Sequence, residues 1–428
     1  MATSSKVVSK AHLIPFTLLV CIFFVWGLAA NMTDMLLAAF KKIMSMGDFQ
    51  TSLIQVAYYG SYFFLAFPAA LFIRKFSYKA GILLGLGMYI VGALLFYPAS
   101  QTMQYEHFLV ALFVIAGGIT FLETSANPYA LIMGDESTAI QRLNLAQAFN
   151  PIGALTGVVA GKFIILSALN EASESERIKL STIDLQNIQE KELFAVMIPY
   201  VGIAVLLFVI WIIIVSRKMP KGAEASKTPI MESIKRLAKN KMYRSGVLIQ
   251  FLNVGGMTAV FSFMIRFVMA EMNLDEEGAA TYQIISLITF TVSRFAFTAL
   301  LSKYSPQFLL GISSFVGVIC LAIAISTGGI ISVVSLIAIS ACMSLTFPTI
   351  FGLACHGTGK DQKIAGSGLV MAVCGGAALP ALQGYISDVT GSIKVSYLVP
   401  LVCLISVVLY SLYANSLLRK SEVELMEL

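Results

Sequence analysis

The sequence predicts an all-α integral membrane protein with twelve transmembrane helices in two pseudo-symmetric halves of six. Two observations indicate this class. Of the 428 residues, 58% are hydrophobic and only 12% are charged, whereas soluble domains carry about 25% charged residues. Uncharged apolar stretches also recur along the chain, each close to the roughly 20 residues that a helix needs to cross a bilayer.

We expect the twelve helices at residues 13–40, 51–73, 80–100, 107–133, 144–168, 194–216, 245–271, 279–301, 307–326, 331–355, 364–387 and 396–417. The first stretch is long and interrupted by polar residues, and no small-residue cleavage site follows it. It is therefore predicted to be the first span and not a cleaved signal peptide.

Lysine and arginine are distributed unevenly over the connections between the spans. If both termini are cytoplasmic, the inside segments carry 20 of these residues and the outside loops carry 6. Such a bias sets the orientation of membrane proteins, so both termini are predicted to be cytoplasmic and the bilayer is the chain's environment. The net charge of +6 follows this topology and does not indicate nucleic-acid binding.

The most basic connection, residues 217–244, follows the sixth span and contains Pro220, Gly222 and Pro229. It predicts a cytoplasmic linker between an N-terminal half at 1–216 and a C-terminal half at 245–428. Residues 230–241 are expected to form a short amphipathic helix on the inner membrane surface. Pro128 late in the fourth span and Pro348 late in the tenth fit a duplicated architecture.

Two acids lie inside predicted spans: Asp34 in the first and Glu123 in the fourth. A charge in hydrocarbon costs at least about 2.5–3.5 kcal/mol, so such groups normally face a protein interior or a water-filled cavity. Asp34 and Glu123 are therefore the candidate proton-coupling residues. A structural alternative remains for each, including an ion pair of Glu123 with Arg294 or Lys162.

Amide side chains accompany these acids at helical spacing. An amide both donates and accepts hydrogen bonds, so it matches sugar hydroxyls without adding charge. Together with Glu123, the candidate substrate-binding residues are Asn31, Asn127, Gln147, Asn150, Gln250 and Asn253, with Asn144 extending the stripe on the fifth span. The alternative function for any single amide is to hold two helices together.

Other chemistry finds little support in the sequence. The six cysteines all fall in spans, without metal-ligand or redox spacing. No Ser-His-Asp set and no paired catalytic carboxylates on one span were found. We therefore expect no enzyme activity, no metal and no cofactor; a polytopic membrane enzyme and a nutrient sensor are the alternative classes.

Several segments resemble one known family. They are FVWGLAANMTD at 24–34, LETSANP at 122–128, RLNLAQAFN at 142–150 and FPTIF at 347–351. The chain resembles the L-fucose permeases of the fucose–galactose–glucose:proton symporter branch of the major facilitator superfamily. The resemblance extends over nearly the whole chain.

The resemblance implies a bacterial inner-membrane symporter that takes up a neutral monosaccharide with H⁺, and we expect a monomer. It implies that Asp34 couples protons, that Glu123 binds proton and sugar, and that Asn31, Gln147 and Asn150 contact the sugar. Phe347 stands where these permeases have a tyrosine, and Met257 and Phe261 replace a more polar surface. Glucose, galactose or another hexose therefore stays open as substrate, as do sodium coupling and facilitated transport.

Overall fold

The computed structural model describes residues 6–43, 48–102, 104–165, 181–220 and 229–426, apart from some side chains within them. Every regular element in these residues is helical. Eleven helical stretches of the described residues are long and apolar enough to cross a membrane. The all-helical membrane architecture predicted from composition is therefore confirmed.

Contacts divide the chain into two compact units. The N-terminal unit comprises residues 14–126 and 149–222, and the C-terminal unit comprises residues 1–13, 127–148 and 223–428. Residues 127–148, which the sequence assigns to the first six helices, thus pack with the last six. The division into six-helix halves at 1–216 and 245–428 stays a prediction.

The N-terminal unit is built from long helices. They are α1 (Leu13–Ile43), α2 (Asp48–Lys75), α3 (Tyr78–Thr102), most of α4 (Tyr105–Ile132), α6 (Phe149–Ala160) with a π-helical turn at Gly161–Ile165, and α8 (Thr182–Ser216). Helix α8 packs along α3, where the Trp211 indole donates a hydrogen bond to Leu83 O at 3.1 Å. Phe96 and Tyr200 stack 4.4 Å apart between the same two helices.

Glycines bring α1 and α6 into backbone contact. A Cβ atom on Gly153 would lie 1.8 Å from Phe24 O, and one on Gly27 would lie 1.9 Å from Asn150 O. Real Cβ contacts are not shorter than 3.0 Å. Small residues permit such close packing of membrane helices, so Gly27 and Gly153 have a direct steric explanation.

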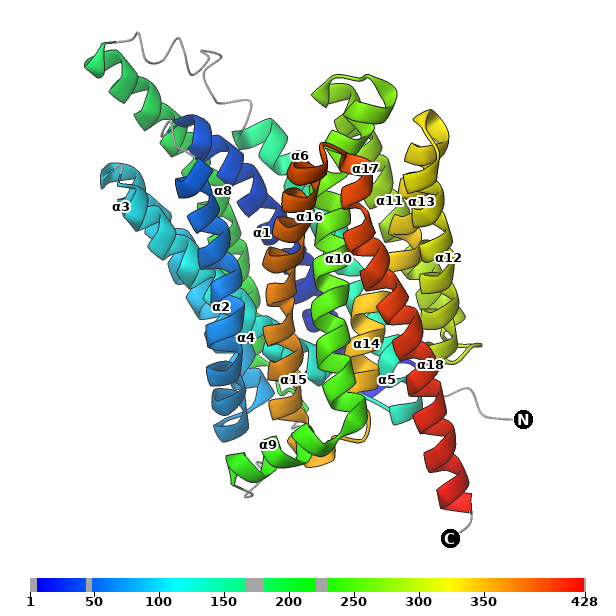
Figure 1. The fold of residues 1–428 in the computed structure, drawn as a ribbon. Coiled ribbons are helices and arrows are strands. Elements are labelled where there is room, and N and C mark those ends of the chain that lie inside the picture. The colour runs from blue at the N-terminus through cyan, green and yellow to red at the C-terminus, as the bar shows by residue number, and fades with distance from the viewer. Residues whose placement is uncertain (1–5, 44–47, 103, 166–180, 221–228, 427–428) are drawn as a thin grey trace. The chain divides into compact units, whose positions relative to one another are not determined.

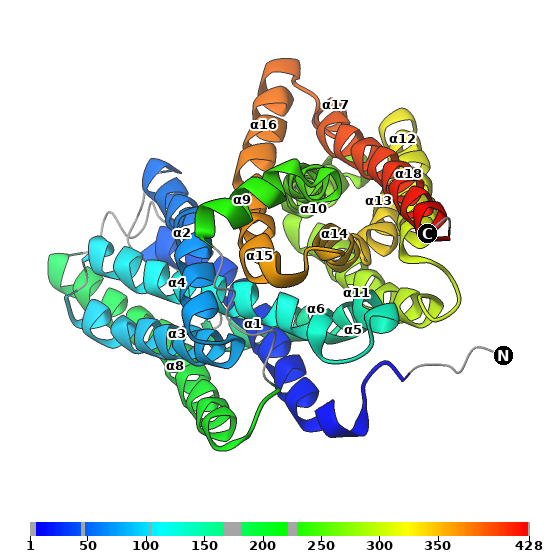
Figure 2. The ribbon, with the colours of Figure 1, turned by 90° about the horizontal axis from the view of Figure 1, so that it is seen from below.

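The C-terminal unit contains α5 (Ala139–Gln147), α9 (Ile230–Lys239), α10 (Lys241–Met272), α11 (Glu276–Leu300), α12 (Pro306–Ser326), α13 (Gly329–Met343), α14 (Thr346–Cys355), α15 (Gln362–Met371), α16 (Gly375–Thr390), α17 (Ile393–Ser396) and α18 (Leu398–Met426). Helix α10 is central, with α16 on one side and α18 on the other (Figure 1). Helix α14 also packs against α10, as the view from below shows (Figure 2).

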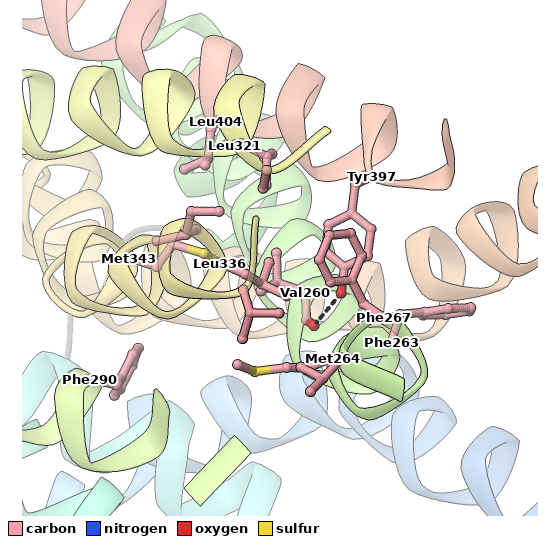
Figure 3. Close-up of a cluster of buried hydrophobic side chains, with 14 of the residues drawn as sticks. Val260, Phe263, Met264, Phe267, Phe290, Leu321, Leu336, Met343, Tyr397 and Leu404 are labelled. Carbon is pink, nitrogen blue, oxygen red and sulfur yellow. Dashed lines mark hydrogen bonds between the residues drawn. The ribbon is translucent and has the colours of Figure 1, made fainter. Parts of the chain in front are cut away.

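A hydrophobic core of this unit is built around α10 (Figure 3). The rings of Phe267 and Tyr397 meet edge to face at 4.9 Å, and the Tyr397 hydroxyl donates to Val260 O at 3.3 Å. Because a buried tyrosine usually needs a hydrogen-bond partner, this bond allows Tyr397, the residue before α18, to be buried in an otherwise apolar core. Met257 and Phe261 pack on the same cluster.

Three of the expected continuous spans are broken, and one of them, the eleventh at 364–387, is divided into α15, a 3-10 turn at Ala372–Cys374 and α16. The predicted fifth span at 144–168 is divided into α5, α6 and the π-helical turn, with Ala148 between the first two; its last three residues lie outside the described residues. The tenth span is divided into α13 and α14. The breaks of the fifth and tenth spans come shortly before Pro151 and Pro348, and a proline removes a backbone donor from the helix. In the linker, α9 confirms the predicted short helix.

Candidate substrate and proton site

Glu123 is the most unusual side chain of the N-terminal unit. It is 1% exposed on α4, and neither carboxyl oxygen has a hydrogen-bond partner within the described part of the chain. The Tyr62 hydroxyl, also buried, is close enough to act on it, but the pair falls short of hydrogen-bond geometry. A buried ionised carboxylate without partners is costly, so this environment favours the neutral, protonated acid.

The hydroxyl groups of Thr124 and Ser125, next to Glu123 on α4, are bonded to main-chain carbonyls of their own helix. Thr124 Oγ1 donates to Thr120 O at 2.7 Å, and Ser125 Oγ donates to Phe121 O at 2.7 Å. Serine and threonine in helices commonly satisfy themselves in this way. These two hydroxyls are therefore satisfied within their own helix, whereas the carboxyl oxygens of Glu123 have no hydrogen-bond partner among the described residues.

Asn31 and Asn150 come together around Gly27. The Asn31 amide donates to Gly27 O at 3.1 Å, and Asn150 Nδ2 donates to Phe23 O at 3.3 Å across the close α1–α6 contact. Both amides are only partly buried. Asp34 follows Asn31 on α1, but its side chain lies outside the described residues, so its predicted role in proton coupling stays a prediction.

Asn127 and Gln147 form a direct pair in the C-terminal unit. Gln147 Nε2 donates to Asn127 Oδ1 at 2.7 Å, and both side chains are buried. The Asn127 amide nitrogen has no partner among the described residues. This pairing joins α4 to the end of α5 and still leaves a donor for a polar ligand.

Gln250 and Asn253 lie three residues apart on α10, which places them on one face of the helix. Gln250 is 0% exposed, and neither its amide nitrogen nor its oxygen has a partner within the described residues; the amide nitrogen of Asn253 is likewise unpaired. Leaving a buried polar group unpaired costs about 1–3 kcal/mol. A polyhydroxylated ligand would supply the missing partners.

Two further polar residues, Asn144 and Arg294, make contacts between helices of the C-terminal unit. Asn144 Nδ2 donates to Thr349 Oγ1 at 3.2 Å, and Arg294 donates to main-chain carbonyls instead of pairing with a described acid. The position of Asn144 in the amide stripe was the available signal for the first contact. Phe347 is buried and stacks with Phe351 at 6.3 Å.

These features define a polytopic helical membrane protein with a buried acid, Glu123, and several buried amides in its helices. Residues 18–379 match the family model of the Major Facilitator Superfamily. The chain belongs to this superfamily.

Among its relatives, the L-fucose-proton symporter of Haemophilus influenzae is 35% identical, covering 97% of this chain and all of that protein. The L-fucose-proton symporter of Escherichia coli is 36% identical over 95% and 94%. The glucose/galactose transporter of Brucella abortus is 34% identical over 96% of both chains. The crystal structure of the transporter FucP in the outward conformation matches with a TM-score of 0.89 at 35% identity, covering 95% of this chain and 99% of that one.

Proposed function

We propose that this chain is a proton-coupled symporter that imports a neutral monosaccharide, with L-fucose as its principal substrate. Two relatives named L-fucose-proton symporters support the substrate. The observation that carries proton coupling is Glu123, a carboxyl group buried in a span with neither oxygen hydrogen-bonded in the described part of the chain. Such a group holds a proton readily and returns it when water or a cation reaches it.

The cycle follows from the charge of this site. With the cavity open outward, Glu123 takes up a proton, and the neutral acid together with the amides binds the sugar. Neutralisation removes the charge that opposes closure of the cavity. The carrier therefore changes easily between its outward-open and inward-open states when it holds both proton and sugar, or when it is empty. Each proton that enters contributes about 2.3 kcal/mol per 100 mV of membrane potential. Asp34 shares or relays the proton.

The second candidate substrate is glucose or galactose. The similarity to the Brucella transporter supports it, and so does Phe347, which supplies no hydroxyl. A site that hydrogen-bonds a substrate hydroxyl discriminates strongly against analogues that lack it. Sodium coupling and facilitated transport are alternatives that the experiment below separates.

We further propose that the protein acts as a monomer in the bacterial inner membrane, with cytoplasmic termini and no enzyme activity. The two six-helix halves, 1–216 and 245–428, would move against each other around the site, as in other transporters built from repeats. The similarity to FucP in the outward conformation supports the following assignment. The contacts of α5 with α11 and α14 belong to a state in which the cavity is closed toward the cytoplasm.

The test is the external pH of a weakly buffered suspension of cells that express the chain. L-fucose, D-galactose and D-glucose are added in turn, with and without Na⁺. Proton symport predicts alkalinisation by the transported sugar, independent of Na⁺. Glu123→Gln should abolish this signal and concentrative uptake while retaining sugar exchange, whereas Asp388→Asn, which changes an exposed acid of α16, should behave as wild type. Concentrative uptake by Glu123→Gln would refute the role of this acid.

A further inference from the structure

Arg294 on α11 is a buried cation, 4% exposed. Its Nε donates to Ser344 O at 2.6 Å, and its Nη1 donates to Gln147 O at 3.1 Å. The guanidinium carbon lies 4.7 Å from the centroid of the Phe290 ring. No ion pair with Arg294 occurs among the described residues, so its charge is held by carbonyl dipoles and one aromatic face.

Both carbonyls that Arg294 contacts stand four residues before a proline. In an α-helix the carbonyl of residue i accepts from the N–H of residue i+4, and proline has no N–H. Pro151 therefore leaves Gln147 O without its helical donor, and Pro348 does the same to Ser344 O. Arg294 supplies a hydrogen bond to both of these carbonyls.

These contacts join helices that are distant in the sequence. Gln147 is the last residue of α5, and Ser344 follows the last residue of α13. The exposed carbonyls at a helix C-terminus carry partial negative charge, which attracts a cation. One guanidinium group thus fastens two proline-broken helices to α11.

Two further hydrogen bonds fasten α5 to the same neighbours. Gln141 Nε2 donates to Thr298 O at 3.1 Å on α11, and Asn144 Nδ2 donates to Thr349 Oγ1 at 3.2 Å on α14. With the Arg294 contact they follow one side of α5 at intervals of three residues. In the predicted halves, α5 belongs to the first, whereas α11 and α14 belong to the second.

We propose that Arg294 is a positioning residue that links the substrate amides to closure of the inner side, by holding the two carbonyls freed by Pro151 and Pro348. This inference rests on the proposed transport function. Gln147 takes part twice: its side chain pairs with Asn127, and its carbonyl is the acceptor for Arg294. Opening to the inside separates α5 from α11, so the bond to Gln147 O breaks in each cycle while that to Ser344 O is kept.

The first test measures access to α5 directly. Ala146, fully buried on α5, is replaced by cysteine, and its alkylation by a membrane-permeant maleimide in the purified full-length protein is followed by mass spectrometry of the labelled peptide. Arg294→Gln should accelerate this labelling roughly tenfold, because a hydrogen bond from a charged donor is lost. Arg266→Gln, which changes an exposed arginine within a span, is the matched control. Equal rates for Arg294→Gln and wild type would overturn the proposal.

The second test uses the prolines. In a Pro151→Ala background, residue 151 regains an N–H for Gln147 O, so Arg294→Gln should then accelerate labelling less than about threefold. Pro380→Ala, in α16, is the control background and should leave the tenfold effect intact. An equal effect of Arg294→Gln in the Pro151→Ala and wild-type backgrounds contradicts the proline mechanism.

The readout separates this inference from the proposed function. Labelling depends on neither the sugar nor the coupling ion, so absence of proton uptake in cells leaves the labelling result meaningful. Should Arg294→Gln fail to fold, Arg294→Lys replaces it. Lysine keeps the charge but lacks the planar fork, so it should give a smaller acceleration that the Pro151→Ala background again reduces; no acceleration would count against the proposal.

Discussion

The contact between α1 and α6 leads to a quantitative prediction for Gly153→Ala. The added Cβ atom would lie 1.8 Å from Phe24 O and 2.9 Å from Leu28 N. Both obstacles are backbone atoms, which cannot rotate away as a side chain can. The two helices must therefore move apart by roughly 1 Å or more, in an interior that is close-packed.

Overpacking of this kind typically costs 1–3 kcal/mol, and the rigidity of the backbone places Gly153→Ala near about 3 kcal/mol of the unfolding free energy. The expected fall in Tm is roughly 3 °C, measured on purified protein in detergent. Because Asn150 bridges α6 to Phe23 O, sugar binding should weaken as well.

Gly202→Ala is the matched control. Gly202 is an exposed helical glycine of α8, and a Cβ there would meet nothing within 4 Å. Alanine is favoured over glycine in a helix by up to about 1 kcal/mol, so this variant should be neutral or slightly stabilised. If Gly153→Ala and Gly202→Ala unfold at the same temperature, the steric explanation of the α1–α6 contact is wrong.

Two further predictions concern ion pairs of the C-terminal unit. Arg236 on α9 makes a bidentate pair with the buried carboxylate of Asp361, with both N–O distances at 2.7 Å. Arg236→Gln should release α9 and raise the rate of proteolytic cleavage in the linker roughly tenfold. Unchanged cleavage would show that other contacts hold α9. Lys394 Nζ lies 3.0 Å from Glu271 Oε2, and that oxygen also accepts from Gly329 N. Lys394→Met leaves a largely buried carboxylate without its cation and should cost about 1–3 kcal/mol, seen as a lower Tm that Glu271→Gln in the same chain partly restores.

Much of the candidate site could be predicted because its residues are polar side chains within otherwise apolar spans. A carboxyl group in an apolar stretch is conspicuous, and the structure confirms that Glu123 is buried and without a hydrogen-bond partner among the described residues. Amides at helical spacing are equally visible, and Gln250 and Asn253 are both buried on α10. The side chain of Asp34 lies outside the described residues, so its role remains a prediction.

Other features of the site depend on contacts that no local pattern encodes. The sequence left an ion pair of Arg294 with Glu123 as an alternative, whereas the structure gives Arg294 hydrogen bonds to two main-chain carbonyls, one of them 147 residues away. Pro151 is visible in the sequence, but the donor that compensates for its missing N–H comes from another helix. The pair of Gln147 with Asn127 likewise bridges 20 residues.

The sequence alone determined that this chain is a helical membrane protein with acids and amides in its spans, because composition, helical spacing and proline chemistry act over a few residues. Only the tertiary structure decided which helices those residues join. It assigned residues 127–148 to the C-terminal unit and placed α1 and α6 in backbone contact. Packing of distant helices depends on shape and on partners far apart in the chain, and periodicity within one helix carries no information about either.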